Sequence, residues 1–192
     1  MRRAGVPMAY SSGFSPHPRI SYAGAAPTGT ASEAEYVELG LSERCDPDKV
    51  KDALNRALPP GFDVVAVVEA GGRHLPGLLQ ASWWRLELPG VEVAALPQLA
   101  GALTDADQVE VVRMTKKGER HFDVRPALVK IWASDGALEF VIRHGEPLVR
   151  PDDVAKALRI IEPELMDDLD TPRATRLAQG PLVAGEVGDP LK

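Results

Sequence analysis

The segment SSGFSPHPRI, residues 11–20, holds the side chains in this chain that are best suited to chemistry. Prolines on both sides of His17 favour an extended backbone, because a residue that precedes proline is driven out of the helical region. In an extended chain His17 and Arg19 project on the same side. Histidine exchanges protons near neutral pH, and arginine binds phosphate or carboxylate through paired hydrogen bonds. The segment therefore predicts a rigid loop that recognises an anionic group.

Hydroxyls and exposed backbone N–H groups next to this histidine extend the candidate binding site. The residues concerned are Ser11, Ser12, Gly13 and, further along, Tyr22. An alternative hypothesis makes His17 a general acid or base, assisted by Ser12 or Tyr22, with Arg19 stabilising negative charge. A third interpretation is a bent surface connection in which the histidine and arginine are structural.

The sequence SEAEY places Glu33 and Glu35 two residues apart, on one face of an expected strand. Paired carboxylates can hold a metal ion, perform acid–base chemistry or pair electrostatically with Arg19. Charged residues at the start of a strand are also common as solvated edge groups. Both glutamates are retained as candidate binding residues.

A second group of basic residues follows in the chain and has Trp132 nearby. A basic sheet face that carries an aromatic ring is a possible platform for RNA. Lysines at a hairpin tip also protect a sheet edge from pairing, which is the alternative explanation. The cluster comprises Arg113, Lys116, Lys117, Arg120, His121, Arg125 and Lys130, of which we expect Arg113, Lys116, Lys117, Arg120 and Arg125 to contact RNA.

Several classes of chemistry find no support in the sequence. The four histidines have no metal-ligand spacing, and a single cysteine, Cys45, allows neither an internal disulfide nor an iron–sulfur cluster. We therefore expect no metal and no cofactor. The net charge of -6 argues against a chain-wide polycation. No apolar run is long enough for a membrane span and no signal peptide is evident, so a cytoplasmic protein without a membrane partner is expected.

The elements expected to position these residues fall into two halves. The first reads strand, strand, helix, strand, over residues 19–25, 35–41, 46–58 and 62–70. Asp46 and Pro47 give the helix an N-cap and a proline at its first position.

A glycine-rich loop at residues 71–77 separates the halves. The second reads strands at 82–90, 107–115, 121–133, 137–144 and 173–182, with helices at 92–103 and 150–160. We predict an α+β protein of two ferredoxin-like, β-α-β-β-α-β halves, the first incomplete at its N-terminus. The halves span residues 1–72 and 78–182, with a flexible tail at 183–192.

The stretch RRAGVPMAYSSGFSPHPRISYAGAAPTGTASEAEYVEL, residues 2–39, resembles the start of the radical SAM-linked protein family, a domain of unknown function. Members of that family are fused to, or encoded beside, a B12-binding radical SAM protein. They also carry a further strand and helix ahead of this stretch. The resemblance thus implies a radical SAM partner. It further implies either that residue 1 is not the native start or that the first half is destabilised.

The expected function is that of a non-catalytic accessory or substrate-binding protein that works with the radical SAM partner. RNA is the expected substrate by analogy of fold. A metal-free, RNA-acting enzyme that uses His17 is one alternative. A structural interaction protein is the other.

Overall fold

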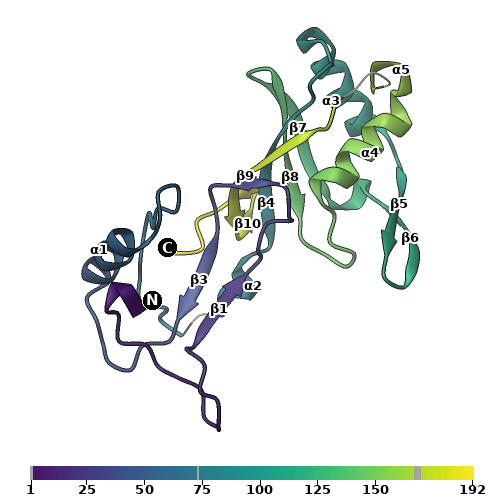
Figure 1. Ribbon diagram of the computed structural model, residues 1–192. Coiled ribbons are helices and arrows are strands. Elements are labelled where there is room, and N and C mark those ends of the chain that lie inside the picture. The colour runs from purple at the N-terminus through teal and green to yellow at the C-terminus, as the bar shows by residue number, and fades with distance from the viewer. Residues whose placement is uncertain (1, 73, 167–169) are drawn as a thin grey trace. The chain divides into compact units, whose positions relative to one another are not determined.

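The computed structural model describes residues 2–72, 74–166 and 170–192 (Figure 1). The fold is a mixture of helices and mostly antiparallel sheets, which confirms the predicted α+β class. The chain forms two compact units. The first takes its described residues from 1–25 and 36–76 with Leu191, and the second from 26–35 and 77–190 with Lys192.

The first unit contains a two-stranded sheet and one long helix. Strand β1 (Ile20–Ala23) pairs antiparallel with β3 (Tyr36–Leu39). A 3-10 turn, η1 (Arg2–Ala4), precedes them, and helix α1 (Pro47–Ala57) follows. The Asp46 side chain accepts hydrogen bonds from the N–H groups of the first turn, as expected for an N-cap. The predicted helix is therefore confirmed to within one residue at each end.

The predicted strand at 62–70 was wrong, because this segment has no regular secondary structure. The Asn55 side chain on α1 takes the place of a strand partner: it donates to the carbonyl of Val64 at 3.1 Å and accepts from its N–H at 2.7 Å. Val65 and Val68 are exposed to solvent. β-branched residues favour a strand only where neighbouring strands supply packing, which explains the error.

The second unit is built on a five-stranded sheet with the order β2-β9-β4-β8-β7. The four strands from β9 to β7 are antiparallel to their neighbours, and β2 is parallel to β9. The strands are β2 (Ala31–Ser32), β4 (Ala81–Glu87), β7 (Leu128–Ser134), β8 (Ala137–Arg143) and β9 (Arg173–Gly180).

Helices cover one face of this sheet and close its core (Figure 1). Residues of α3 (Leu96–Asp105) and α4 (Pro151–Ile161) pack against each other and share a cluster with Trp84 and Phe140 from the strands. Trp83, by contrast, points to the opposite face and donates from Nε1 to Glu139. The alternation of side chains along β4 thus places the two tryptophans on opposite faces of the sheet. The short elements α2 (Leu75–Leu78), η2 (Val93–Ala95), η3 (Arg125–Ala127) and α5 (Pro163–Met166) complete the helical structure.

Two hairpins are added to this sheet. One, β5 (Glu110–Thr115) with β6 (Gly118–Asp123), lies between α3 and β7 in the chain. The other pairs β10 (Leu182–Val183) with β11 (Glu186–Val187). Except for Leu182, this hairpin falls within residues 183–192, the segment predicted as a flexible tail. In the described residues, no helix combines the length and apolar character needed to cross a bilayer.

Candidate functional site

The predicted recognition loop forms a hydrogen-bonded hairpin on the first unit, which we call the 9–19 hairpin. The Arg19 N–H donates to the Ala9 carbonyl at 2.8 Å, and the Ser11 N–H donates to the His17 carbonyl at 2.9 Å. Ser11 also accepts at Oγ from the His17 N–H, at 3.1 Å. These bonds fix the two arms of the hairpin, so Ser11 serves the backbone of the loop.

The tip of the 9–19 hairpin, residues 12–16, lies in solvent. Gly13 has a φ of 122°, a conformation that L side chains rarely adopt. Phe14 beside it has a relative exposure of 111%, so its ring makes almost no contact with the rest of the protein. Sequence analysis overlooked Phe14, although a lone aromatic between serines in a proline-rich loop is a usable signal for an exposed anchor.

The polar candidates of this unit remain exposed and separate. His17, Arg19 and Tyr22 are all exposed, and the Arg19 carbonyl accepts from the Gly40 N–H at 2.8 Å. Within the ranges that the structure describes, no hydrogen bond joins the His17 ring to Ser12, Arg19 or Tyr22. The arrangement can bind a partner from outside but holds no pre-formed acid–base pair.

The acidic candidates lie in the second unit. Glu35 is ion-paired with Arg176 of β9, whereas the sequence pointed to Arg19 as a partner. Arg176 is 3% exposed. It also donates from Nε to Ser32 Oγ and from Nη1 to Gln179 Oε1, each at 3.2 Å. This buried cluster binds residues 26–35 to the sheet.

Backbone contacts reinforce the same attachment. Gln179 donates from Nε2 to the Ala34 carbonyl at 2.7 Å, and the Glu33 N–H donates to the Arg176 carbonyl at 2.9 Å. Burial raises the pKa of Glu35, but hydrogen bonding from Ser32 and the charge of Arg176 outweigh it, so that the pKa is lowered. Glu35 therefore stays ionised in a structural role, and the Glu33 side chain is exposed.

Two of the five expected RNA contacts are used inside the second unit. Arg113 is ion-paired with Asp153, a residue only 1% exposed, and donates to the Leu148 carbonyl at 2.9 Å. Arg125 donates to the carbonyls of Thr104 and Leu128 at 3.0 and 3.1 Å. Arg113 thus holds the β5–β6 hairpin in place, and Arg125 holds the η3 turn that follows it.

The other basic candidates are more accessible. Lys116 and Lys117 lie exposed at the turn between β5 and β6. Arg120 pairs with Glu146 at 2.8 Å in a partly exposed contact. His121 lies between Glu110 and Glu119, and Lys130 pairs with Glu186 while its Nζ lies 5.0 Å from the centroid of the Trp132 ring.

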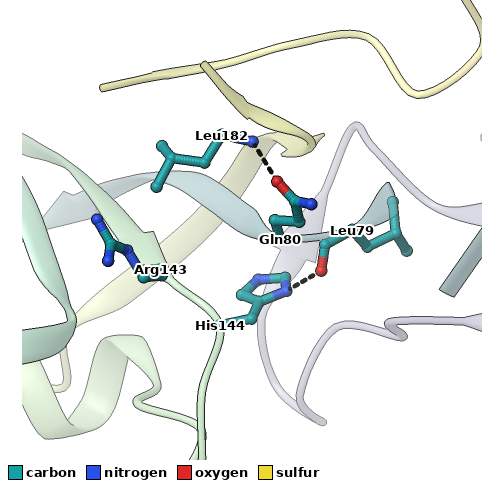
Figure 2. A pocket seen from close by; sticks show the side chains of 5 residues that line it. All are labelled: Leu79, Gln80, Arg143, His144 and Leu182. Atoms are coloured by element: carbon teal, nitrogen blue, oxygen red, sulfur yellow. Dashed lines mark hydrogen bonds between the residues drawn. The ribbon is translucent and has the colours of Figure 1, made fainter. Parts of the chain in front are cut away.

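Sequence analysis missed a cavity at the end of β8. It measures about 530 Å³ and is lined by Leu79, Gln80, Arg143, His144 and Leu182 (Figure 2). A polar residue directly after the apolar run of β8 was the available signal, but His144 alone did not indicate a cavity. The cavity is also lined by Leu79, Gln80 and Leu182, which are far from His144 in the sequence.

Metal binding finds no support in the geometry. Within residues 2–72, 74–166 and 170–192, no three His, Cys, Asp or Glu side chains are grouped so that they could hold an ion. Cys45 donates weakly to the Glu43 carbonyl at 3.6 Å, and His74 is exposed.

The fold and these sites define an α+β protein whose candidate groups lie on an exposed hairpin, at a basic turn and around one cavity. The chain belongs to a family of uncharacterised proteins conserved in bacteria (DUF2344), whose family model matches residues 1–151. The match includes the 9–19 hairpin and most of the cavity wall, and it confirms the expected domain of unknown function. A comparison with curated proteins finds no match.

Proposed function

We propose that this chain is a non-catalytic accessory protein that docks onto a B12-binding radical SAM protein through the 9–19 hairpin and presents RNA to it in the cytoplasm. The radical SAM partner is suggested by the resemblance of residues 2–39. The observation that carries the docking role is the full exposure of Phe14 at the tip of a fixed hairpin.

A phenyl ring that is left in water carries a free-energy cost, which a binding partner can remove. Burying a phenylalanine in a partner's pocket contributes roughly 1.5–3 kcal/mol, and aromatic anchors dominate many interfaces. The backbone bonds of the 9–19 hairpin reduce the entropy lost on docking. His17 and Arg19, on the same hairpin, can supply polar contacts around such an anchor.

The RNA part of the proposal is supported by the turn between β5 and β6. Lys116 and Lys117 project there without the internal carbonyl and carboxylate partners that occupy Arg113 and Arg125. Lysines of this kind contact phosphates without reading sequence. Binding would be weak and would fall as salt releases the condensed counterions.

We also infer that the second unit is a ferredoxin-like domain. In chain order β4, β7, β8 and β9 are its four strands, with α3 and α4 as its two crossover helices. The spatial order β9-β4-β8-β7 and the antiparallel pairing support this assignment. The β5–β6 hairpin is then an insertion before the second strand.

The docking proposal is tested by measuring the affinity of the full chain for the purified B12-binding radical SAM protein of the same organism. Phe14→Ser is compared with Phe62→Ser, which removes another exposed aromatic ring from the same unit. We expect Phe14→Ser to weaken binding by about tenfold or more and Phe62→Ser to leave it unchanged. Equal effects of the two substitutions, or no binding by the wild-type chain, would refute docking through the 9–19 hairpin.

The RNA proposal is tested with a short single-stranded RNA and fluorescence anisotropy. Affinity is expected to fall as salt rises from about 50 to about 200 mM, and to fall at low salt when Lys116 and Lys117 are replaced by Glu. Cleavage or modification of the RNA by the chain alone, abolished in His17→Ala, would instead establish an enzyme.

A further inference from the structure

The five-stranded sheet carries two neighbouring tryptophan rings on the face opposite to the helix-covered core. Trp83 of β4 and Trp132 of β7 have ring centroids 6.1 Å apart and planes inclined by 41°. Trp132 is opposite Glu139 of β8, and Glu139 is opposite Arg85 of β4, so alternation places these residues on the face of Trp83. Both rings are only partly buried, whereas Trp84 on the helical side is 4% exposed. Because the rings are tilted, neither covers the other as a flat stack would.

The Trp83 ring is held in a fixed orientation by its indole N–H. Its Nε1 donates to Glu139 Oε2 at 3.0 Å, and the other oxygen of Glu139 lies 3.5 Å from Nη1 of Arg85. Arg85 also donates to the Asp135 carbonyl at 2.7 Å. The polar atom of the indole is thus in use, and the aromatic surface is what the ring can offer to a ligand. A ring that is already fixed loses little entropy when a ligand stacks on it.

A lysine lies directly beside these rings. Lys130 precedes Trp132 by two residues on β7, and its Nζ lies 5.0 Å from the centroid of the Trp132 ring. Its ammonium group is ion-paired with Glu186 of β11, whose side chain is 73% exposed. An ion pair this exposed contributes little stability. A phosphate can therefore replace the Glu186 carboxylate on Lys130 at a small cost.

We propose that the face formed by Trp83, Trp132 and Lys130, which we call the tryptophan face, binds single-stranded RNA. An unpaired base stacks on the tryptophan rings, and a neighbouring phosphate takes the place of Glu186 on Lys130. Aromatic rings next to a cation match the alternation of bases and phosphates in a single strand. In a duplex the base faces are already stacked on one another, so only an unpaired strand fits.

This inference rests on the RNA part of the proposed function and names the surface and the form of RNA concerned. Stacking on a ring does not depend on which base is present, so we expect binding with little sequence preference. The lysines between β5 and β6 supply charge alone, whereas the tryptophan face supplies contacts to bases.

The inference is tested by titrating the full chain with an oligouridylate of about eight nucleotides and following tryptophan emission. We expect saturable quenching, because a stacked base lies against an indole ring. An abasic oligomer of the same length carries the same phosphates without bases, and it should bind about tenfold more weakly or worse. Equal affinity for the two oligomers would overturn base stacking.

Trp132→Leu tests the ring itself, since leucine keeps an apolar side chain on the sheet and removes the aromatic surface. It should weaken oligouridylate binding by about tenfold or more. Phe62→Leu, which removes an exposed aromatic ring from the first unit, is the control and should leave the affinity unchanged. An equal effect of the two substitutions would overturn the tryptophan face, and the amide spectrum of each free variant reports whether it is folded.

Glu186→Gln gives a second test, in which binding is gained. It frees Lys130 and should raise the affinity for oligouridylate by about two- to fivefold. Glu164→Gln removes the same charge from an exposed position on α5 and should change the affinity by less than about twofold. Equal gains in the two variants would show a general effect of net charge and overturn the phosphate contact at Lys130.

The outcomes also separate this inference from the proposed function. Absence of any RNA binding by the wild-type chain would overturn both. Salt-dependent binding that is lost when Lys116 and Lys117 are replaced by Glu, but that shows no quenching and is unchanged in Trp132→Leu, would overturn the tryptophan face alone. If Trp132→Leu instead weakened binding of the radical SAM protein and not of RNA, the face would be a protein-binding surface and the inference would be wrong.

Discussion

Glu35 and Arg176 lie 141 positions apart in the sequence and form an ion pair that holds residues 26–35 against β9. The two partners differ in environment: Arg176 is buried, whereas the Glu35 side chain is nearly half exposed. The buried guanidinium lies 5.5 Å from the centroid of the Trp84 ring. It also donates hydrogen bonds to the side chains of Ser32 and Gln179. The pair therefore matters chiefly because it neutralises a buried charge.

Glu35→Ala is expected to lower the free energy of unfolding of the second unit by about 1–3 kcal/mol, because it leaves a buried guanidinium without its carboxylate. Glu33→Ala is the matched control, since the Glu33 side chain is exposed and its backbone N–H, which the substitution keeps, donates to the Arg176 carbonyl; its effect should stay within about 0.5 kcal/mol. Urea unfolding followed by tryptophan fluorescence measures both, because Trp83, Trp84 and Trp132 all belong to this unit. Indistinguishable midpoints for the two variants would contradict a stabilising role for the pair.

Acid should destabilise the second unit in two stages. Burial lowers the pKa of His144 from 6.5 in the fold, so below pH 6.5 the unfolded chain binds a proton that the folded chain does not. Stability is thus complete above pH 6.5 and falls as the pH drops towards the folded pKa. The pKa of Glu35 is lowered from 4.5, which adds a second loss below pH 4.5.

The same fluorescence measurement, repeated between pH 7.5 and pH 4, tests this expectation. His144→Gln should remove the dependence on pH in the window just below 6.5 and keep the later loss due to Glu35. If the variant and the wild-type chain showed parallel pH profiles throughout, His144 would not be the group responsible.

Sequence patterns predicted the elements of this protein better than its contacts. Helix α1 was recognisable from Asp46 and Pro47, and the strands of the second unit from alternating and β-branched residues, because these signals are local. The segment at 62–70 carried the same β-branched signal, but Asn55 satisfies the backbone of Val64 and no strand forms there. Whether such a segment forms a strand depends on neighbours that are distant in the sequence.

The candidate sites show the same limit. The exposed position of His17 follows from the prolines beside it, a local effect. The partner of Glu35 could not be predicted, because Arg176 is on a strand that follows two crossover helices. The basic residues near 113–130 form one group in sequence, yet Arg113 is bound to buried Asp153 while Lys117 is in solvent. Residue type gives the charge, and only the fold determines which charges are already paired.

This division of the basic cluster gives a direct prediction. Arg113→Ala should destabilise the second unit by roughly 3 kcal/mol, because it leaves the nearly inaccessible carboxylate of Asp153 unpaired. Lys117→Ala should change the free energy of unfolding by less than about 0.5 kcal/mol. Urea titration of the two variants checks the difference. A neutral Arg113→Ala would return that arginine to the set of residues free to contact RNA.

A close backbone contact next to the cavity supplies the last prediction. A Cβ atom at Gly180 would lie 2.0 Å from the Gly188 carbonyl oxygen, so Gly180→Ala must displace the chain around the β10–β11 hairpin. We expect a loss of about 1–3 kcal/mol in stability. We also expect faster amide hydrogen exchange at Gly188, whose N–H donates to the Pro181 carbonyl at 2.8 Å.

Gly145→Ala is the control, because a Cβ atom there meets no other atom within 4 Å. A stable Gly180→Ala variant with slow exchange at Gly188 would show that the C-terminal segment moves aside without cost.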